Sequence, residues 1–379
     1  MASPVRPARS AYALDRNEAE SPRGRIAIAA ALARGTADPT AELRQHLDHC
    51  LGCLSCQAAC PAHVQYDELL IETRALLGPA PGRPRRLLAL LGKPSRMRML
   101  RRPLGWIALP RWKGWLARHL PLAPAWRAAL LSLPDAAPAP AARNLKRDDG
   151  SPRLALFAGC VASVDDAQAQ QAAIVLLQAA GFQVVVLPAF CCGAIDLHGG
   201  ETDAAASAAQ RVRQAWDASG AAKLVSATPG CLGTLRRALP GVHVLDPLEL
   251  LATHGQALRF RPLAQRVALH LPCTQTNVAH TDAVMLQLLR RIPELEVLPV
   301  ARPPHCCGAA GSHLLEFPER AARLRDDTLR QAAALAPQRL LSSNIGCRLH
   351  LAAGMPSHHL HWPTEHPLTL LARQLEYPH

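Results

Sequence analysis

Aromatic side chains and long apolar runs are both scarce in this chain of 379 residues. Phe, Trp and Tyr make up 4% of the sequence, and hydrophobic residues make up 49%, so aliphatic side chains must build most of the core. No window offers about 18 uninterrupted apolar residues, which excludes a predicted transmembrane helix. Residues 1–25 also lack the apolar stretch of a secretory signal peptide. We therefore expect a cytosolic protein of two or three domains.

Acidic side chains are missing from residues 73–134, which contain no Asp or Glu. Arg and Lys are frequent there, with Trp106, Trp112 and Trp115 among them, and the whole chain has a formal net charge of +13. We expect a Pro-interrupted, solvated connector whose tryptophans pack on the neighbouring domains. The alternative is a docking surface for an acidic partner or anionic lipid. With the Pro/Ala-rich linker that follows, the connector is predicted to span residues 81–152.

Residues 1–80 contain two clear helix patterns. The stretch "SPRGRIAIAAALARG" has Ser21 at the capping position, a proline at the first helical position and Gly35 after its end. The stretch "VQYDELLIETRALLG" predicts a second helix that ends at Gly78. We expect residues 1–80 to form an all-helical, ferredoxin-like section.

Cysteine, by contrast, is abundant, with twelve residues in the chain. Four of them lie in "CLGCLSCQAACP", residues 50–61, with the C-x2-C-x2-C-x3-C-P spacing of an iron–sulfur run. Structural zinc sites usually come as two short pairs that are well separated in sequence, so four thiols in one loop favour a multi-iron cluster. Clustered thiols in a cytosolic protein indicate metal or redox chemistry more than disulfides. The predicted ligands are Cys50, Cys53, Cys56 and Cys60.

The remainder of the chain repeats itself. The matching pairs are "RLALFAGC" (153–160) with "RVALHLPC" (266–273), "FCCGAIDLHGG" (190–200) with "HCCGAAGSHLL" (305–315), and "LVSATPGC" (224–231) with "LLSSNIGC" (340–347). The cysteines of each pair are separated by 113, 115 and 116 residues. Each half follows the order strand, helix, strand, CCG, helix, strand, Cys, which predicts two α/β domains with mostly parallel sheets, at 153–255 and 264–379.

Eight cysteines fall in this repeat, at strand ends or in the turns that follow, where open α/β sheets bind ligands. A lone buried cysteine usually behaves as a small hydrophobic residue, and adjacent cysteines can form a strained vicinal disulfide. The same pattern of four cysteines occurs in both repeats, which favours a role as metal ligands. Because neighbouring residues on a strand point to opposite faces, Gly193 and Gly308 are expected to let each CCG turn bend. The predicted ligands are Cys160, Cys191, Cys192, Cys231, Cys273, Cys306, Cys307 and Cys347.

Four further residues are candidates for binding a cofactor. Arg23 and Arg25 of "ESPRGR" would offset the negative charge of a thiolate-bound cluster; the alternative is a solvated helix start. His198 and His313 follow the CCG motifs and could donate hydrogen bonds to a cluster or serve as ligands. The sequence has no Ser/His/Asp set, Walker loop or convincing G-x-G-x-x-G, so the chain is expected to move electrons without a flavin or nicotinamide of its own.

Together these motifs resemble the glycolate oxidase (glycolate dehydrogenase) iron–sulfur subunits, within the family that has paired cysteine-rich CCG domains. The resemblance rests on "ESPRGRI", "HLDHCLGCLSCQAACP", "FCCGAIDLH", "HLPCTQTNVAH", "HCCGAAGSH" and "SSNIGCRLHLA". It implies an oxidoreductase subunit, incomplete as a catalyst alone, that binds a 4Fe-4S cluster at the first run and further clusters at the CCG sites. The implied partners are FAD-binding flavoprotein subunits and a quinone-type acceptor, with the chain at the inner face of the membrane.

One part of the family pattern is missing. The family has an earlier ferredoxin-type run, ending in C-P-x-Y, ten residues before the proline of "PRGR". Tyr12 keeps this distance from Pro22, but the preceding cysteine positions hold Arg9, Val5 and Ala2. In two-cluster ferredoxins the fourth cysteine of a run serves the other cluster. We therefore expect one cluster at this section, which Cys60 either completes or leaves with an open, labile iron.

Other interpretations stay open at the level of sequence. A related CCG subunit of a lactate or glycerol-3-phosphate dehydrogenase, or of a heterodisulfide reductase-like complex, would share this architecture. The pI of about 9.6 also fits a basic, metal-stabilised binding module, but no recognition motif for nucleic acid occurs, so no specific nucleic acid is expected. A degenerate assembly scaffold is disfavoured by the intact CCG pair.

Overall fold

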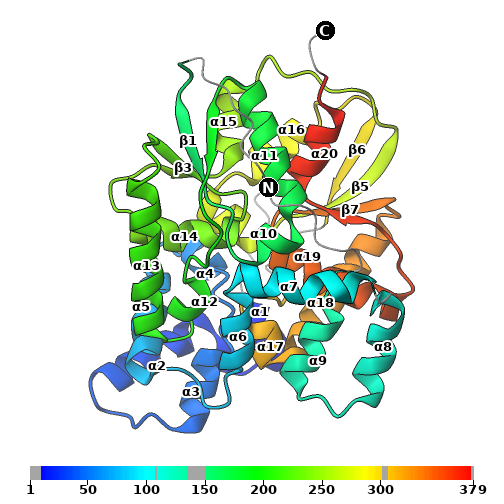
Figure 1. Cartoon of the computed structure of the whole chain (residues 1–379). Helices are drawn as coiled ribbons and strands as arrows, with labels where there is room; N and C mark the ends of the chain where they lie inside the picture. Colours follow the sequence, from blue (N-terminus) through cyan, green and yellow to red (C-terminus); the bar gives the residue numbers. More distant parts are fainter. Residues whose placement is uncertain (1–9, 107–108, 135–149, 301–305, 377–379) are drawn as a thin grey trace.

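The computed structural model describes residues 10–106, 109–134, 150–300 and 306–376. Helices of the N-terminal part lie below two α/β units, whose sheets occupy the upper part of the view in Figure 1. The predicted Pro/Ala linker falls largely on residues 135–149, outside the described part. Within that part, no helix is both long and apolar enough to cross a membrane.

The N-terminal section is helical, as predicted. Its elements are α1 (Ser10–Asp15), η1 (Glu18–Glu20), α2 (Pro22–Ala33), α3 (Ala41–Asp48), α4 (Ser55–Ala58) and α5 (Tyr66–Leu77). The Ser21 hydroxyl accepts a hydrogen bond of 3.0 Å from the N–H of Gly24 and caps α2. Gly35 follows α2 and Gly78 ends α5, both with φ of +66°, so the two predicted helices and their end signals are confirmed.

The segment without acidic residues, 73–134, is called the basic segment here. It contains four further helices: α6 (Arg85–Leu91), α7 (Pro94–Trp106), α8 (Leu109–His119) and α9 (Pro124–Leu131). The expectation that its tryptophans pack on neighbouring domains is wrong for Trp112 and Trp115, whose exposed fractions are 57% and 47%. The two rings instead pack edge to face on each other, 6.2 Å apart, on α8 at the lower edge of the molecule (Figure 1). The side chain of Trp106 lies outside the described residues.

The first α/β unit contains a parallel sheet in the order β2-β1-β3-β4. Leu156 of β1 pairs with Val186 on one side and with Val225 on the other. The elements are β1 (Arg153–Leu156), α10 (Val161–Asp165), α11 (Ala167–Ala179), β2 (Gln183–Val186), α12 (Ala194–Leu197), α13 (Thr202–Asp217), β3 (Lys223–Val225), α14 (Pro229–Ala238), β4 (Val244–Leu245) and α15 (Pro247–His254).

The second unit repeats this topology, with the parallel order β6-β5-β7-β8. The mixed α/β fold with parallel sheets that the repeat predicts is thereby confirmed. The elements are β5 (Gln265–His270), η2 (Gln275–Ala279), α16 (Asp282–Leu289), β6 (Leu295–Pro299), α17 (His313–Glu316), α18 (Pro318–Ala334), β7 (Arg339–Ser342), α19 (Ile345–Gly354), η3 (Met355–His358), β8 (Thr364–Glu365) and α20 (Pro367–Gln374).

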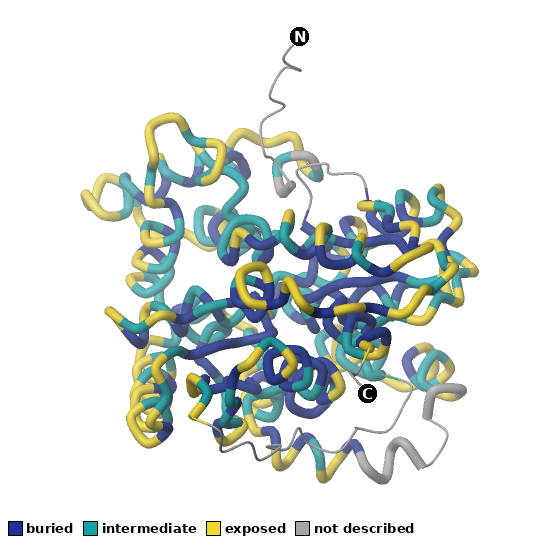
Figure 2. Tube along the Cα trace, turned by 90° about the horizontal axis from the view of Figure 1, so that it is seen from above, coloured by how far each residue is buried: buried dark blue, intermediate teal, exposed yellow. Residues whose placement is uncertain are grey.

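The two units pack through a shared apolar core. Helix α11 of the first unit packs on α20 of the second, and α15 packs on α16 in the corresponding way. Figure 2 shows buried chain at the centre of the molecule, with exposed chain around it. Buried polar contacts also cross the interface: Arg348 pairs with Asp166 at 2.5 Å, and His366 Nε2 lies 3.1 Å from the carbonyl oxygen of Ala227. The orientation of the two repeats is therefore fixed by apolar packing and by specific polar pairs.

Candidate functional site

Four cysteines of the first repeat converge at the carboxyl edge of its sheet. Cys160 precedes α10, Cys191 and Cys192 lie in the turn after β2, and Cys231 lies in the first turn of α14. The thiols of Cys160 and Cys192 donate hydrogen bonds to the Cys191 sulfur, and these bonds lower the pKa of Cys191 to about 3. Cys192 also has a hydrogen bond with Cys231, so pairwise contacts connect the four sulfurs that are predicted to be ligands.

The second repeat brings its four cysteines together in the same way. Cys273 and Cys307 donate hydrogen bonds to the Cys306 sulfur and hold its pKa well below the usual range. Cys307 also donates a hydrogen bond to the sulfur of Cys347, which lies in the first turn of α19. Cys306, Cys307 and Cys347 are buried. None of the twelve cysteines, all of which lie in the described residues, forms a disulfide bond.

The glycine of each CCG motif bends the chain directly after the two neighbouring cysteines. Gly193 and Gly308 have φ angles of +86° and +91°, in the region that glycine alone adopts without strain. A side chain on Gly193 would lie 2.7 Å from the Cβ of Ala208, and one on Gly308 would collide with the backbone of Ala321. The predicted role of both glycines in bending the CCG turn is confirmed.

Three of the four cysteines in the N-terminal run lie together, and Cys60 stands apart. Burial, followed by the neighbouring charges of Cys50 and Cys53, raises the pKa of Cys56 to about 12. Hydrogen bonds from the backbone at Val64 and Ala62 lower the pKa of Cys60, and none of the other cysteines affects it. The geometry therefore gathers three thiols at this loop and turns the fourth toward its own backbone.

The N-terminal run lies directly against the second cysteine set. Burial and then the charge of Cys306 raise the pKa of Cys53 to about 11, and Cys53 packs in the same apolar cluster as Cys273. Asn277 of η2 donates hydrogen bonds to the carbonyl oxygen of Cys53 at 2.6 Å and to the Ser55 hydroxyl at 3.2 Å. Asn277 carries no signal in the sequence, because no spacing rule relates η2 to a loop that lies so much earlier in the chain.

The two candidate arginines differ in burial and in their distance from the cysteines. Arg25 is 4% exposed, pairs with Glu20, and has its pKa raised by Cys50 and Tyr66 against the opposing effect of burial. The Arg23 side chain is 83% exposed and pairs with Glu18. Only Arg25 therefore lies beside the cysteines. Tyr66, which the sequence did not single out, places its hydroxyl 3.5 Å from the Cys50 sulfur.

The two candidate histidines line the cavity that contains the cysteines. Burial lowers the pKa of His198, and its backbone carbonyl accepts a hydrogen bond from Arg74. The Nδ1 atom of His313 lies 3.2 Å from the carbonyl oxygen of Gly308, and burial lowers the pKa of His313 to about 4. Its buried Nε2 atom has no hydrogen-bond partner among the described residues.

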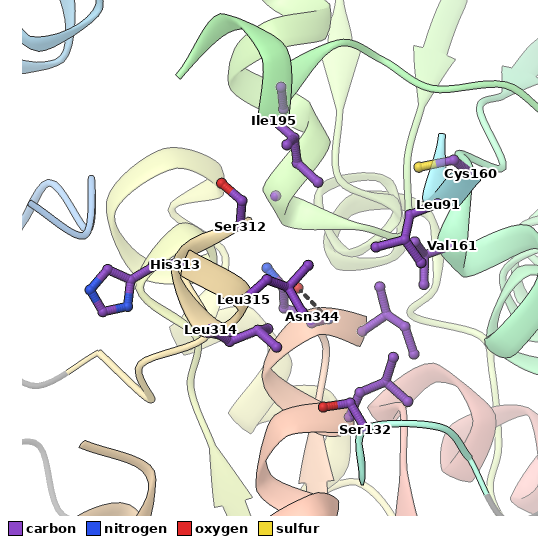
Figure 3. A pocket seen from close by; sticks show the side chains of 18 of the residues that line it. Leu91, Ser132, Cys160, Val161, Ile195, Ser312, His313, Leu314, Leu315 and Asn344 are labelled. Carbon is purple, nitrogen blue, oxygen red and sulfur yellow. Dashed lines mark hydrogen bonds between the residues drawn. The ribbon is translucent and has the colours of Figure 1, made fainter. Parts of the chain in front are cut away.

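One cavity of about 550 Å³ joins these groups. Cysteines of all three sets line it, and apolar side chains from the basic segment, including Leu87, Leu91 and Met97, line it too. Figure 3 shows Cys160 and Leu91 across the cavity from Ser312 and Leu314. The helices of the connector thus close over the cysteines, a contact between segments that neither motif nor periodicity could reveal.

Arg83 attaches the connector to both repeats. Its side chain is 3% exposed and donates hydrogen bonds to the carbonyl oxygen of Ile195 at 2.8 Å, to the Ser312 hydroxyl at 3.3 Å and to the Glu316 carboxylate. Ile195 belongs to the first repeat, and Ser312 and Glu316 belong to the second. A single buried guanidinium therefore links three parts of the chain at the edge of the cavity.

The fold and the repeated cysteine turns define a class of protein with two cysteine-rich α/β domains. The family model described as CCG, "Cysteine-rich domain", matches residues 154–236 and 267–352, which are the segments that carry the two sets. The chain therefore carries two domains that match this cysteine-rich family.

The relatives narrow the class. The chain is 26% identical to the glycolate oxidase iron-sulfur subunit of Escherichia coli, over 93% of this chain and 88% of that one. It is 28% identical to a probable glycolate oxidase iron-sulfur subunit of Bacillus subtilis, over 89% and 84%. It also matches one of the subunits of the CoM/CoB fumarate reductase of Methanothermobacter marburgensis, at 27% identity over 52% and 41%. The chain is thus a homologue of glycolate oxidase iron–sulfur subunits, which are subunits of an oxidoreductase complex.

The donor atoms fit iron–sulfur clusters. Each CCG set offers four sulfurs connected by pairwise contacts, and the N-terminal loop offers three neighbouring thiols. Soft thiolates of this kind select iron–sulfur clusters or zinc. The names of the relatives favour the first, so both the site and the comparisons support iron–sulfur cluster binding.

Proposed function

We propose that the chain is the iron–sulfur electron-transfer subunit of a flavin-dependent 2-hydroxy-acid dehydrogenase, with glycolate as the first candidate substrate. A flavoprotein partner would oxidise the hydroxy acid to the oxo acid, and the two electrons released would pass through this chain to a quinone-type acceptor. The observation that carries the proposal is that cysteines from all three sets line one cavity.

The proposed ligands divide into three groups. Cys160, Cys191, Cys192 and Cys231 would hold the first CCG cluster; Cys273, Cys306, Cys307 and Cys347 the second; Cys50, Cys53 and Cys56 a cluster of the ferredoxin type. Clusters held there would supply one-electron redox chemistry. We also propose the division into functional segments at 1–80, 81–152, 153–255 and 264–379.

The surrounding residues have roles that follow from their contacts. Arg25, buried beside Cys50, would offset the negative charge of a thiolate-bound cluster and favour its reduced state. Asn277 holds the Cys53 loop against the second set and so keeps the two sites adjacent. The apolar side chains of α6 and α7 exclude water from the cavity, which preserves thiolate–metal contacts and sets the local dielectric.

The proposal is tested by anaerobic purification, with iron and acid-labile sulfide counted per chain and EPR recorded on the reduced protein. We expect several irons and sulfides per chain, and loss of one EPR signal in Cys307→Ser. Addition of the flavoprotein and glycolate should then reduce the clusters. A colourless protein that carries stoichiometric zinc would contradict the proposal.

A related dehydrogenase is the second candidate. Lactate utilization protein A of Exiguobacterium matches 52% of this chain at 22% identity, and the match spans 91% of that protein. A lactate, glycerol-3-phosphate or heterodisulfide system would use the same cysteine sets. The reduction assay separates the hydroxy-acid and glycerol-3-phosphate systems, because only the substrate that its flavoprotein oxidises would deliver electrons to the clusters. A heterodisulfide is an electron acceptor and would instead reoxidise the reduced clusters.

A further inference from the structure

The large apolar side chains that remain exposed are concentrated on one part of the molecule. Six of them lie on α7, on α9 and on α8 with the turn after it, and among the described residues Leu76 is the other large hydrophobic side chain exposed to this degree. We call these six the α7–α9 patch. Its members are Met99 (68% exposed), Leu100 (44%), Trp112 (57%), Trp115 (47%), Leu120 (42%) and Trp126 (45%).

The charged side chains of the segment that carries this patch all have one sign. The patch lies wholly within residues 73–134, which contain no Asp or Glu. Arg96, Arg118 and Arg127 are exposed on the same helices. Tryptophan, leucine and basic side chains together are the composition of a surface that lies in a membrane interface, with indole rings at the headgroup level.

The cavity and the patch share side chains. Leu100 and Trp126 are half exposed at the surface and also line the cavity that contains the cysteines. The cavity therefore approaches the surface within the patch. A second copy of the chain is a poor occupant, because self-pairing would bring together two basic segments that have no carboxylate of their own.

We propose that the α7–α9 patch docks on the surface of an anionic lipid bilayer. The tryptophans and leucines enter the acyl boundary, and the arginines and lysines face the phosphate groups. Docking in this orientation places the end of the cavity at the level from which a lipophilic acceptor can enter. That consequence rests on the proposed function, whereas the docking itself is independent of electron transfer.

The test is co-flotation of the full-length, anaerobically purified chain with phosphatidylcholine vesicles that either contain or lack phosphatidylglycerol. We expect binding to the anionic vesicles alone, weakening as salt is raised because screening shortens the reach of the charges. The double variant W112S/W115S should bind about tenfold less tightly, since two exposed indoles lose their apolar contact. Arg118→Gln should bind about fivefold less tightly.

Leu76→Ser is the matched control, since Leu76 is 66% exposed on α5, outside the patch. It should bind vesicles as the parent chain does. Equal binding of W112S/W115S and the parent chain would overturn the proposal, as would equal binding to neutral and anionic vesicles. If the double variant instead abolishes a dimer seen by light scattering, and vesicles bind neither protein, the patch is a contact between copies and the proposal is overturned. Iron content and cluster reduction, measured on the same samples, report separately on the proposed function.

Discussion

At the scale of single residues, the cysteines of the N-terminal loop are unequal. Burial and then the charges of Cys50 and Cys53 raise the pKa of Cys56, whereas Cys60 is hydrogen-bonded by the backbone around Val64. We expect Cys60→Ser to keep the iron content and EPR spectrum of the parent chain, and Cys56→Ser to lose the signal of this loop. Iron lost equally from both variants would show that Cys60 moves to complete the site.

Glu20 is the centre of a buried polar group. Burial alone would raise its pKa, but hydrogen bonds from His49 and His46 and the charge of Arg25 lower it from 4.5 to about 2. The contribution of this carboxylate to stability is therefore complete above about pH 4.5 and declines as the pH falls toward 2.

We expect Glu20→Gln to reduce the free energy of unfolding by about 3 kcal/mol at pH 7, because Arg25 would remain buried without its anionic partner. The difference from the parent chain should be smaller at about pH 4 than at about pH 7, as measured by urea unfolding at both values. The exposed Glu18→Gln change is the control and should cost less than about 1 kcal/mol. A difference that grows as the pH falls would contradict this account of Glu20.

Sequence reasoning succeeded at this scale where a motif carries the chemistry, and it failed where a contact depends on the fold. The spacing of the cysteines was sufficient to group them correctly by repeat. Arg23 and Arg25 are close in sequence and equivalent by pattern, but only the second points to the cysteines. Tyr66 and Asn277 carry no signal that a local pattern could provide, because their partners are distant in the chain.

At the scale of elements, the CCG turns depend on backbone geometry. Gly308→Ala should lower the free energy of unfolding by more than about 2 kcal/mol, because it combines a left-handed φ with a collision at Ala321. Gly114→Ala is the control: the glycine lies within α8 with nothing near its missing side chain, so alanine there should stabilise by about 0.5 to 1 kcal/mol. Denaturant unfolding of both variants measures this, and equal effects would refute the role of the turn.

The elements themselves were largely predictable. Capping at Ser21, the glycines after α2 and α5, and the alternation of strands and helices in each repeat all agree with the structure. The connector was the exception. Its prolines suggested a broken chain, but Pro94 and Pro124 begin helices, a position where a missing N–H costs nothing. The exposure of its tryptophans could not be read from the sequence, since hydrophobic character alone does not state which surface covers a side chain.

At the scale of the whole molecule, Arg83 holds the connector over the two repeats. We expect Arg83→Ala to destabilise the protein by about 3 kcal/mol or more, since it leaves the Glu316 carboxylate without its buried partner. Limited proteolysis should then cut within residues 85–131 faster than in the parent chain. Arg85→Ala is the matched control: that side chain is 64% exposed, pairs with Glu201 at the surface, and should change stability by less than about 1 kcal/mol. Equal proteolysis of both variants would show that the connector is held by its apolar contacts alone.

The repeat also has a consequence for the molecule as a conductor. The two repeats, taken alone, would be equivalent, because an electron that enters either repeat would meet the same set of cysteines. The N-terminal loop exists in one copy and rests against the second half, through Cys53 and Asn277. If the thiols hold clusters as proposed, this attachment to one half sets an order for the electron-transfer path. The cluster of the N-terminal loop lies at one end of the path, and the cluster of the first half lies at the other end. The three cluster sites thus have a defined order, because a single unduplicated segment breaks the symmetry of the two repeats.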